Sequence, residues 1–128
     1  YYFFVSNQLG VQTITLSKDH SSEIVYLDGA WEFSEEFAKN VKPGAKIVLN
    51  YTAKNVFMVA SAQSAVSLQL TLDGHSLDSD AGAHVQNDIV SVQQDQLYKL
   101  VEGSSSGEHQ LIIEVLETGL EAFTFTFG

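Results

Sequence analysis

The chain has 128 residues, of which 45% are hydrophobic, and this length suits one domain with a packed core. It carries 16 acidic and 6 basic residues, a net charge of -10, and every basic residue is lysine. A chain without arginine forks or basic stripes is a poor partner for nucleic acid and for anionic lipid. The absence of cysteine excludes thiolate nucleophiles, cysteine-built zinc sites and dithiol exchange within these residues.

Alternation of apolar and polar residues predicts short β-strands along the whole chain. The clearest case is residues 66–72, where valine and leucine alternate with serine, glutamine and threonine before the turn pair Asp73-Gly74. The predicted strands are residues 11–16, 24–27, 31–33, 45–51, 56–60, 66–72, 89–92, 97–101, 110–116 and 122–127. Residues 34–40 are expected to form either a helical turn or a short strand, and residues 103–107 a hairpin loop.

Turn signals about every 8–12 residues predict an all-β domain, an antiparallel β-sandwich of seven to ten strands or a barrel. We favour a jelly-roll sandwich. No apolar run approaches the ~20 residues of a membrane-spanning helix, so we expect no direct membrane insertion. The expected core consists of Ile14, Leu16, Trp31, Ile47, Leu49, Val56, Met58, Leu68, Leu70, Leu111, Ile113, Phe123 and Phe125.

Several sequence pieces from about residue 24 onward form a recognisable set. They include Leu27-Asp28-Gly29-Ala30-Trp31, Tyr51-Thr52-Ala53-Lys54-Asn55-Val56-Phe57-Met58-Val59, Leu97-Tyr98-Lys99-Leu100-Val101 and the closing Phe123-Thr124-Phe125-Thr126-Phe127-Gly128. Together they resemble the C-terminal module of DipZ-type proteins. In these bacterial proteins a cytochrome c biogenesis membrane region, a thioredoxin-like domain and a β-sandwich tail are fused.

The resemblance implies a jelly-roll similar to carbohydrate-binding modules, in the periplasm or cell envelope, as part of a membrane-anchored or exported protein. Residues 1–23 would then hold the end of a linker and the first strand, and residues 24–128 the sandwich. The family's redox Cys-x-x-Cys would lie upstream, so redox activity is not carried over to this chain. One motif departs from the family, because Gly82-Ala83-His84-Val85 stands where Gly-x-Asp-Val is usual.

Sugar-binding sandwiches offer exposed aromatic rings, and Trp31, Tyr26 and Tyr98 are the candidates here. The alternative for Trp31 is a core anchor whose indole N–H is satisfied inside the protein, because Trp31 and Phe33 share an inward phase. Tyr98 lies between leucines, which favours a half-buried ring.

Hard oxygen ligands for a structural calcium ion could come from Asp73, Asp78 and Asp80. These three are weak candidates, because no bidentate glutamate closes the loop, and the alternative is that they are solvated loop acids. The histidines at positions 20, 75, 84 and 109 have no metal-ligand spacing. We therefore expect no cofactor.

Two functions from different classes remain open. The first is a non-catalytic, carbohydrate-binding-like accessory module that positions an upstream thioredoxin-like oxidoreductase near a cell-wall glycan. The second is a structural domain that docks on its thioredoxin-like neighbour or on a second copy, which the apolar start Tyr1-Tyr2-Phe3-Phe4-Val5 favours. An enzyme is not expected, since no carboxylate pair is placed in a recognisable cleft.

Overall fold

The structure, a computed structural model, describes residues 2–3, 12–18, 21–34 and 36–128, with side chains from residue 25 onward except at residues 35 and 105. Its strands are β1 Tyr2–Phe3, β2 Gln12–Lys18, β3 Ser21–Asp28, β4 Trp31–Phe33, β5 Ala38–Asn40, β6 Ala45–Ser61, β7 Val66–Leu72, β8 Ile89–Val92, β9 Gln96–Val115 and β10 Glu121–Phe127. One short 3₁₀ helix, η1, covers Asp78–Asp80. In the part of the chain that the structure describes, no helix is long and apolar enough to cross a membrane.

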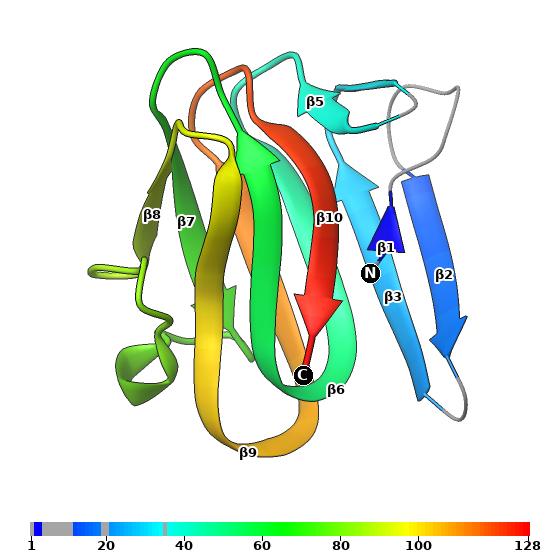
Figure 1. Cartoon of the computed structure of the whole chain (residues 1–128), viewed down its shortest axis with the longest axis vertical. Coiled ribbons are helices and arrows are strands. Elements are labelled where there is room, and N and C mark those ends of the chain that lie inside the picture. Colours follow the sequence, from blue (N-terminus) through cyan, green and yellow to red (C-terminus); the bar gives the residue numbers. More distant parts are fainter. Residues whose placement is uncertain (1, 4–11, 19–20, 35) are drawn as a thin grey trace.

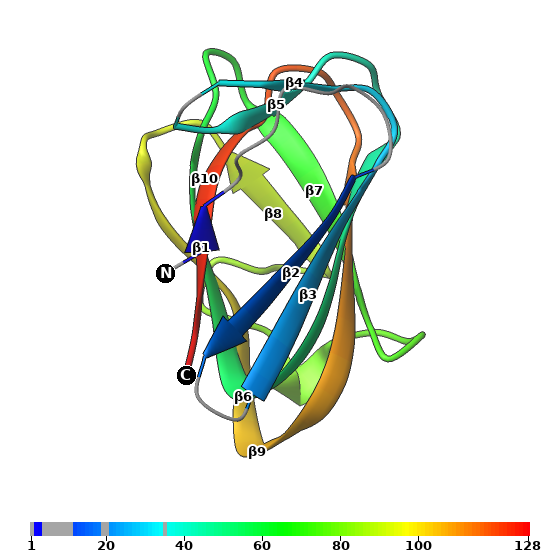
Figure 2. The same ribbon diagram turned by 90° about the vertical axis from the view of Figure 1, so that its right-hand side faces the viewer.

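Two long strands, β6 and β9, organise the molecule. They pair antiparallel from Ala45↔Val115 to Ala60↔Gln96, and both bend at the lower end in Figure 1. On one side of the bend, β6 also pairs with β3, and β9 with β7. On the other side, β6 pairs with β10. Each long strand therefore contributes to both layers of one antiparallel β-sandwich, which confirms the predicted fold class (Figures 1 and 2).

The bend corrects the predicted strand boundaries. Residues 45–51 and 56–60, expected as separate strands, are both parts of β6, and the expected hairpin loop at residues 103–107 lies within β9. The pairing shifts register here, since Ala53 pairs with Gly107 whereas Asn55 pairs with Glu102. Extra residues in one of two paired strands bend the pair without ending it, so the glycine and serine residues turn the corner inside a strand.

Of residues 34–40, only Ala38–Asn40 form a short strand, and a turn closed by the Ser34 N–H to Phe37 carbonyl hydrogen bond (2.9 Å) precedes it. The Ser34 hydroxyl accepts hydrogen bonds from the N–H groups of Glu36 (3.2 Å) and Phe37 (3.1 Å), and this turn leads directly into β5. The domain boundary expected between residues 23 and 24 falls inside β3.

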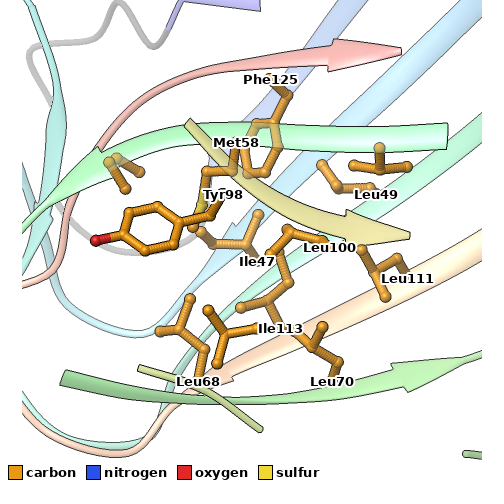
Figure 3. Packing of buried hydrophobic residues seen from close by; sticks show 14 of the residues in the cluster. Ile47, Leu49, Met58, Leu68, Leu70, Tyr98, Leu100, Leu111, Ile113 and Phe125 are labelled. Atoms are coloured by element: carbon orange, nitrogen blue, oxygen red, sulfur yellow. The ribbon is translucent and has the colours of Figure 1, made fainter. Parts of the chain in front are cut away.

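The core fills the space between the layers, where Ile47, Leu49, Met58, Leu68 and Phe125 meet (Figure 3). Every other predicted core residue whose side chain is described is also buried, apart from Phe123. The side chains of Ile14 and Leu16 lie outside the described residues.

Phe123 was wrongly predicted as core. The β10–β6 pairing is irregular between Ala122 and Thr124, and this irregularity breaks the simple alternation of inward and outward side chains. The half-buried Phe123 ring packs edge-on against Phe37, with centroids 5.4 Å apart.

Candidate functional site

The predicted aromatic platform does not form on the surface. Trp31 is fully buried, and its indole N–H donates to the Asp28 carbonyl at 2.9 Å. Tyr98 is 3% exposed, and its hydroxyl donates to the Gln94 carbonyl (2.7 Å) while accepting from the Gln93 N–H (3.1 Å). Tyr26 is half-buried on β3. Because a ring must present a face to solvent to stack on a sugar, Trp31 and Tyr98 act as core anchors.

The predicted calcium ligands do not converge on one point. Asp73 lies after β7 and uses its carboxylate on protein donors, as described below. Asp78 and Asp80 are the ends of η1, and the Asp78 carboxylate accepts from the Ser76 hydroxyl at 3.2 Å. Within the described residues, no group of three or more acidic or histidine side chains is placed to hold a metal ion.

A polar hollow of about 380 Å³ opens beside the bend, and we call it the bend hollow. It is lined by Asn50, Tyr51, Thr52, Asp73, Glu108, His109 and Gln110. The lining comes from two strands and a turn, because residues 50–52 of β6 pair directly with residues 110–108 of β9 and Asp73 lies in the turn after β7. Antiparallel register therefore assembles the bend hollow from positions far apart in the sequence.

The turn after β7 aims Asp73 at β9. Asp73 and Gly74 both have a positive φ, 52° and 84°, and the Asp73 N–H donates to the Gln110 carbonyl at 2.8 Å. Aspartate and glycine are residues that accept this left-handed conformation at low cost. The Asp-Gly pair thus ends β7 as predicted and also fixes the position of a carboxylate.

The Asp73 carboxylate is held at both oxygens. Its Oδ2 lies 2.7 Å from His109 Nδ1, and its Oδ1 accepts the Gln110 N–H at 2.8 Å. Burial works to raise the pKa of Asp73, but these hydrogen bonds and the nearby histidines outweigh it and hold the pKa below its usual value. A carboxylate at Nδ1 requires the proton on that nitrogen, which leaves Nε2 of neutral His109 as an acceptor.

Tyr51 forms the apolar side of the bend hollow. It is 3% exposed, and its ring lies 5.7 Å from His109 and 5.5 Å from Phe127, measured between centroids. Burial raises the pKa of Tyr51, and the charges of Asp73 and Asp80 raise it further, so the phenol is neutral. Its buried hydroxyl has no hydrogen-bond partner among the described residues.

Sequence reasoning missed this cluster, although two local signals pointed to it. The Asp73-Gly74 turn was recognised, and Glu108-His109-Gln110 directly precedes an alternating apolar strand. Nothing local shows that residues 36 positions apart, Asp73 and His109, lie side by side.

Comparisons with known proteins bear on both family and fold. Residues 5–128 match a family model described as thioredoxin like C-terminal domain. A family two carbohydrate esterase from Clostridium thermocellum, solved in complex with cellohexaose, superposes with a TM-score of 0.65 at 22% identity, over 81% of this chain. A family two carbohydrate esterase from Cellvibrio japonicus superposes with a TM-score of 0.61 at 15% identity, over 92% of this chain.

These structural similarities support the sandwich fold, and they cover only part of each esterase. The chain spans 31% of the first esterase and 33% of the second, so it corresponds to about a third of either protein. No curated protein matches the chain.

Proposed function

This chain belongs to the family of thioredoxin-like C-terminal domains, and on that premise we propose that it is a non-catalytic accessory module that binds a glycan in the bend hollow. The observation that carries the proposal is the lining of the hollow. Amide, carboxylate, imidazole and hydroxyl groups converge there on a single opening beside a buried tyrosine. Sugar hydroxyls both donate and accept hydrogen bonds, so such a mixed polar lining suits them.

The acidic lining of the bend hollow limits the kinds of glycan that can bind there. Its lining includes the Asp73 and Glu108 carboxylates and no lysine. Acidic ligands would meet repulsion there, in a chain whose net charge is already -10. The ligand is therefore a neutral sugar chain, or one that carries amino groups. The cellohexaose bound to the Clostridium thermocellum esterase is a neutral sugar chain and supports this reading by analogy of fold.

The parent protein of the proposal is a thiol-disulfide oxidoreductase outside the cytoplasm. This chain has no cysteine, so redox chemistry would belong to an upstream thioredoxin-like domain. The module would hold that domain close to a cell-wall glycan. A bacterial, membrane-anchored or exported parent of the DipZ type, linked to cytochrome c biogenesis, fits this arrangement.

The proposal is tested by co-sedimentation with peptidoglycan and insoluble polysaccharides at low and moderate salt, followed by calorimetry with cellohexaose. Salt-resistant retention that free sugar competes away is expected. Glu108→Gln and Gln110→Ala should each weaken binding about fivefold or more, the loss of roughly one hydrogen bond. Gln63→Ala is the matched control, since Gln63 lines a separate hollow of about 370 Å³ away from the bend. No retention on any glycan would overturn the proposal.

A second candidate function is docking on the thioredoxin-like neighbour or on another copy. Three large apolar side chains are exposed among the described residues, Val41 (41%), Leu97 (38%) and Leu116 (37%). The apolar start is less informative, because Tyr2 and Phe3 pair with β10 of the same chain. Light scattering of the chain and of a Val41→Ser, Leu116→Ser double variant tests self-association. A concentration-independent monomer in both would remove the homo-oligomer form of this alternative.

A further inference from the structure

The first half of β9 forms an edge of the second layer. Within the described residues, Gln96–Val101 pairs as a strand only with β6, and its other side is covered by residues 81–85, which we call the strap. An uncovered edge strand presents unpaired backbone groups to other chains, so the cover matters. The strap follows η1 and leads toward β8 (Figure 1).

The strap is held to β9 by a β-bridge and by two side-chain hydrogen bonds. Ala81 forms a β-bridge with Val101, and the Gly82 N–H donates to the Leu100 carbonyl at 3.0 Å. The Ala83 N–H donates to Glu102 Oε1 at 2.7 Å, and the Lys99 N–H donates to His84 Nδ1 at 2.9 Å. The approach is close, since a Cβ added at Gly82 would lie 2.1 Å from the Lys99 carbonyl oxygen.

The contact made by His84 depends on its protonation state. A ring nitrogen that accepts a backbone N–H must be free of a proton, so Nδ1 is bare in this arrangement. The ring also packs edge-on against Tyr98, with centroids 5.4 Å apart, and Tyr98 is itself fixed by hydrogen bonds to Gln93 and Gln94. The titratable residues of β9 around this contact are Tyr98, Lys99 and Glu102.

The other two histidines whose side chains are described, His75 and His109, lie next to hydrogen-bond acceptors, whereas His84 lies next to a donor. His75 Nδ1 lies 3.0 Å from the Ser76 carbonyl, and His109 Nδ1 lies 2.7 Å from the Asp73 carboxylate. Both partners are acceptors, so protonation preserves these contacts. Protonation of His84 would instead place an N–H against the N–H of Lys99, and the hydrogen bond would be lost.

We propose that His84 is a pH-operated latch, whose protonation frees the Lys99 N–H of β9 and loosens the strap on that edge. When His84 is protonated, the Lys99 N–H loses its acceptor and the backbone of β9 around Lys99 becomes accessible. The edge is then open to solvent and to strand addition by another chain. This inference is independent of the glycan site.

Amide hydrogen exchange followed by NMR at about pH 7.5 and about pH 5.5, corrected for intrinsic rates, tests the latch. We expect the protection of the Lys99 amide to fall about fivefold or more on acidification, the effect of roughly one hydrogen bond. Protection of the Ile113 amide, in the other half of β9, should stay constant.

Two variants separate the latch from a general effect of acid. In His84→Asn the side-chain oxygen replaces Nδ1 as acceptor and does not titrate, so Lys99 protection should be the same at both pH values. His75→Asn should keep the pH dependence of the unaltered chain. The proposal is overturned if Lys99 protection in the unaltered chain does not change with pH, or if His84→Asn loses protection to the same extent.

Discussion

Asn40, at one end of the sandwich, and the lining of the bend hollow, at the other, use their polar groups in opposite ways. At the upper end, around β4 and β5, Asn40 is fully buried and its amide is completely engaged. Its Nδ2 donates to the carbonyls of Lys42 (3.0 Å) and Glu117 (2.7 Å), and its Oδ1 accepts the Leu120 N–H at 2.7 Å. At the lower end, the bend hollow leaves polar groups facing solvent and the Tyr51 hydroxyl without a described partner.

This difference distinguishes polar residues that stabilise the fold from polar residues that are free to bind a ligand. Polar atoms that are buried and saturated fix the connections between strands and have no capacity left for a ligand. Polar atoms at the rim of a hollow contribute less to stability, and they are available to a ligand. Substitutions of the buried Trp31 and Asn40 should therefore act on folding, and substitutions in the lining of the bend hollow on binding.

Trp31→Ala should cause the largest loss at the upper end. The substitution removes a fully buried ring and the donor to the Asp28 carbonyl, which costs about 3–5 kcal/mol for a large aromatic side chain. Urea unfolding measures the loss, and Trp31→Phe, which keeps a ring, should cost less. A loss below about 1 kcal/mol would show that Trp31 does not anchor this end.

Asn40→Ala should come next. It deletes three hydrogen bonds and leaves the buried Leu120 N–H without its acceptor, so we expect a loss of about 2–4 kcal/mol in the free energy of unfolding. Asn50→Ala, at the bend hollow, is the matched control. Asn50 accepts one hydrogen bond, from Gln110 at 3.1 Å, and should cost about 1 kcal/mol or less. Equal losses of unfolding free energy in Asn40→Ala and Asn50→Ala would contradict the difference between the two ends of the sandwich.

Asp73→Asn should have a small effect on stability that depends on pH. Asparagine tolerates the positive φ at this position, so the backbone of the turn is preserved. Because the folded-state pKa of Asp73 is lowered, its contribution is present above the unfolded-state value of about 3.9 and is lost as the pH falls. The Asp73 side chain is 38% exposed, and solvent screening limits the effect to about 1 kcal/mol or less.

The pH dependence of this variant is read from paired unfolding curves. The stability difference between the unaltered chain and Asp73→Asn should be larger near about pH 7 than near about pH 3, where the carboxylate is protonated. A difference that stays the same down to about pH 3 would contradict the hydrogen bonds assigned to the Asp73 carboxylate.

Tyr51→Phe should have the smallest effect, with no loss of stability and a gain of up to about 1 kcal/mol. The buried hydroxyl has no partner among the described residues, so its removal relieves a desolvation cost while the ring contacts remain. Thermal unfolding is the measurement. A loss above about 1 kcal/mol would mean that the hydroxyl is hydrogen-bonded in solution.

Local alternation was sufficient to predict most of the fold. Residues 66–72 have a side-chain period of two that only a strand with one buried face satisfies, and β7 has those bounds. The continuous course of β6 and β9 around the bend was not predictable. Each strand stays continuous because β6 and β9 pair with each other both before and after the bend at Lys54 and Gly103. Such pairing joins residues far apart in the sequence, so no local pattern predicts it.

The site was predicted less well, for a related reason. Aromatic residues were taken as the candidate ligand platform because of their type, yet Trp31 has the inward phase that its spacing to Phe33 indicated. The bend hollow depends on the register between β6, β7 and β9, which brings Asn50, Asp73 and Gln110 together. Register is determined by the whole hydrophobic pattern of paired strands, so single motifs did not reveal it.

The sharing of β6 and β9 by both layers also has a kinetic consequence. Ala45 pairs with Val115, so neither layer is complete until the second long strand has been synthesised and has returned to the first. Pairings this distant in sequence make folding slow and leave intermediate states with open strand edges. Once formed, the two layers should unfold together as one cooperative unit, because neither can lose β6 or β9 alone.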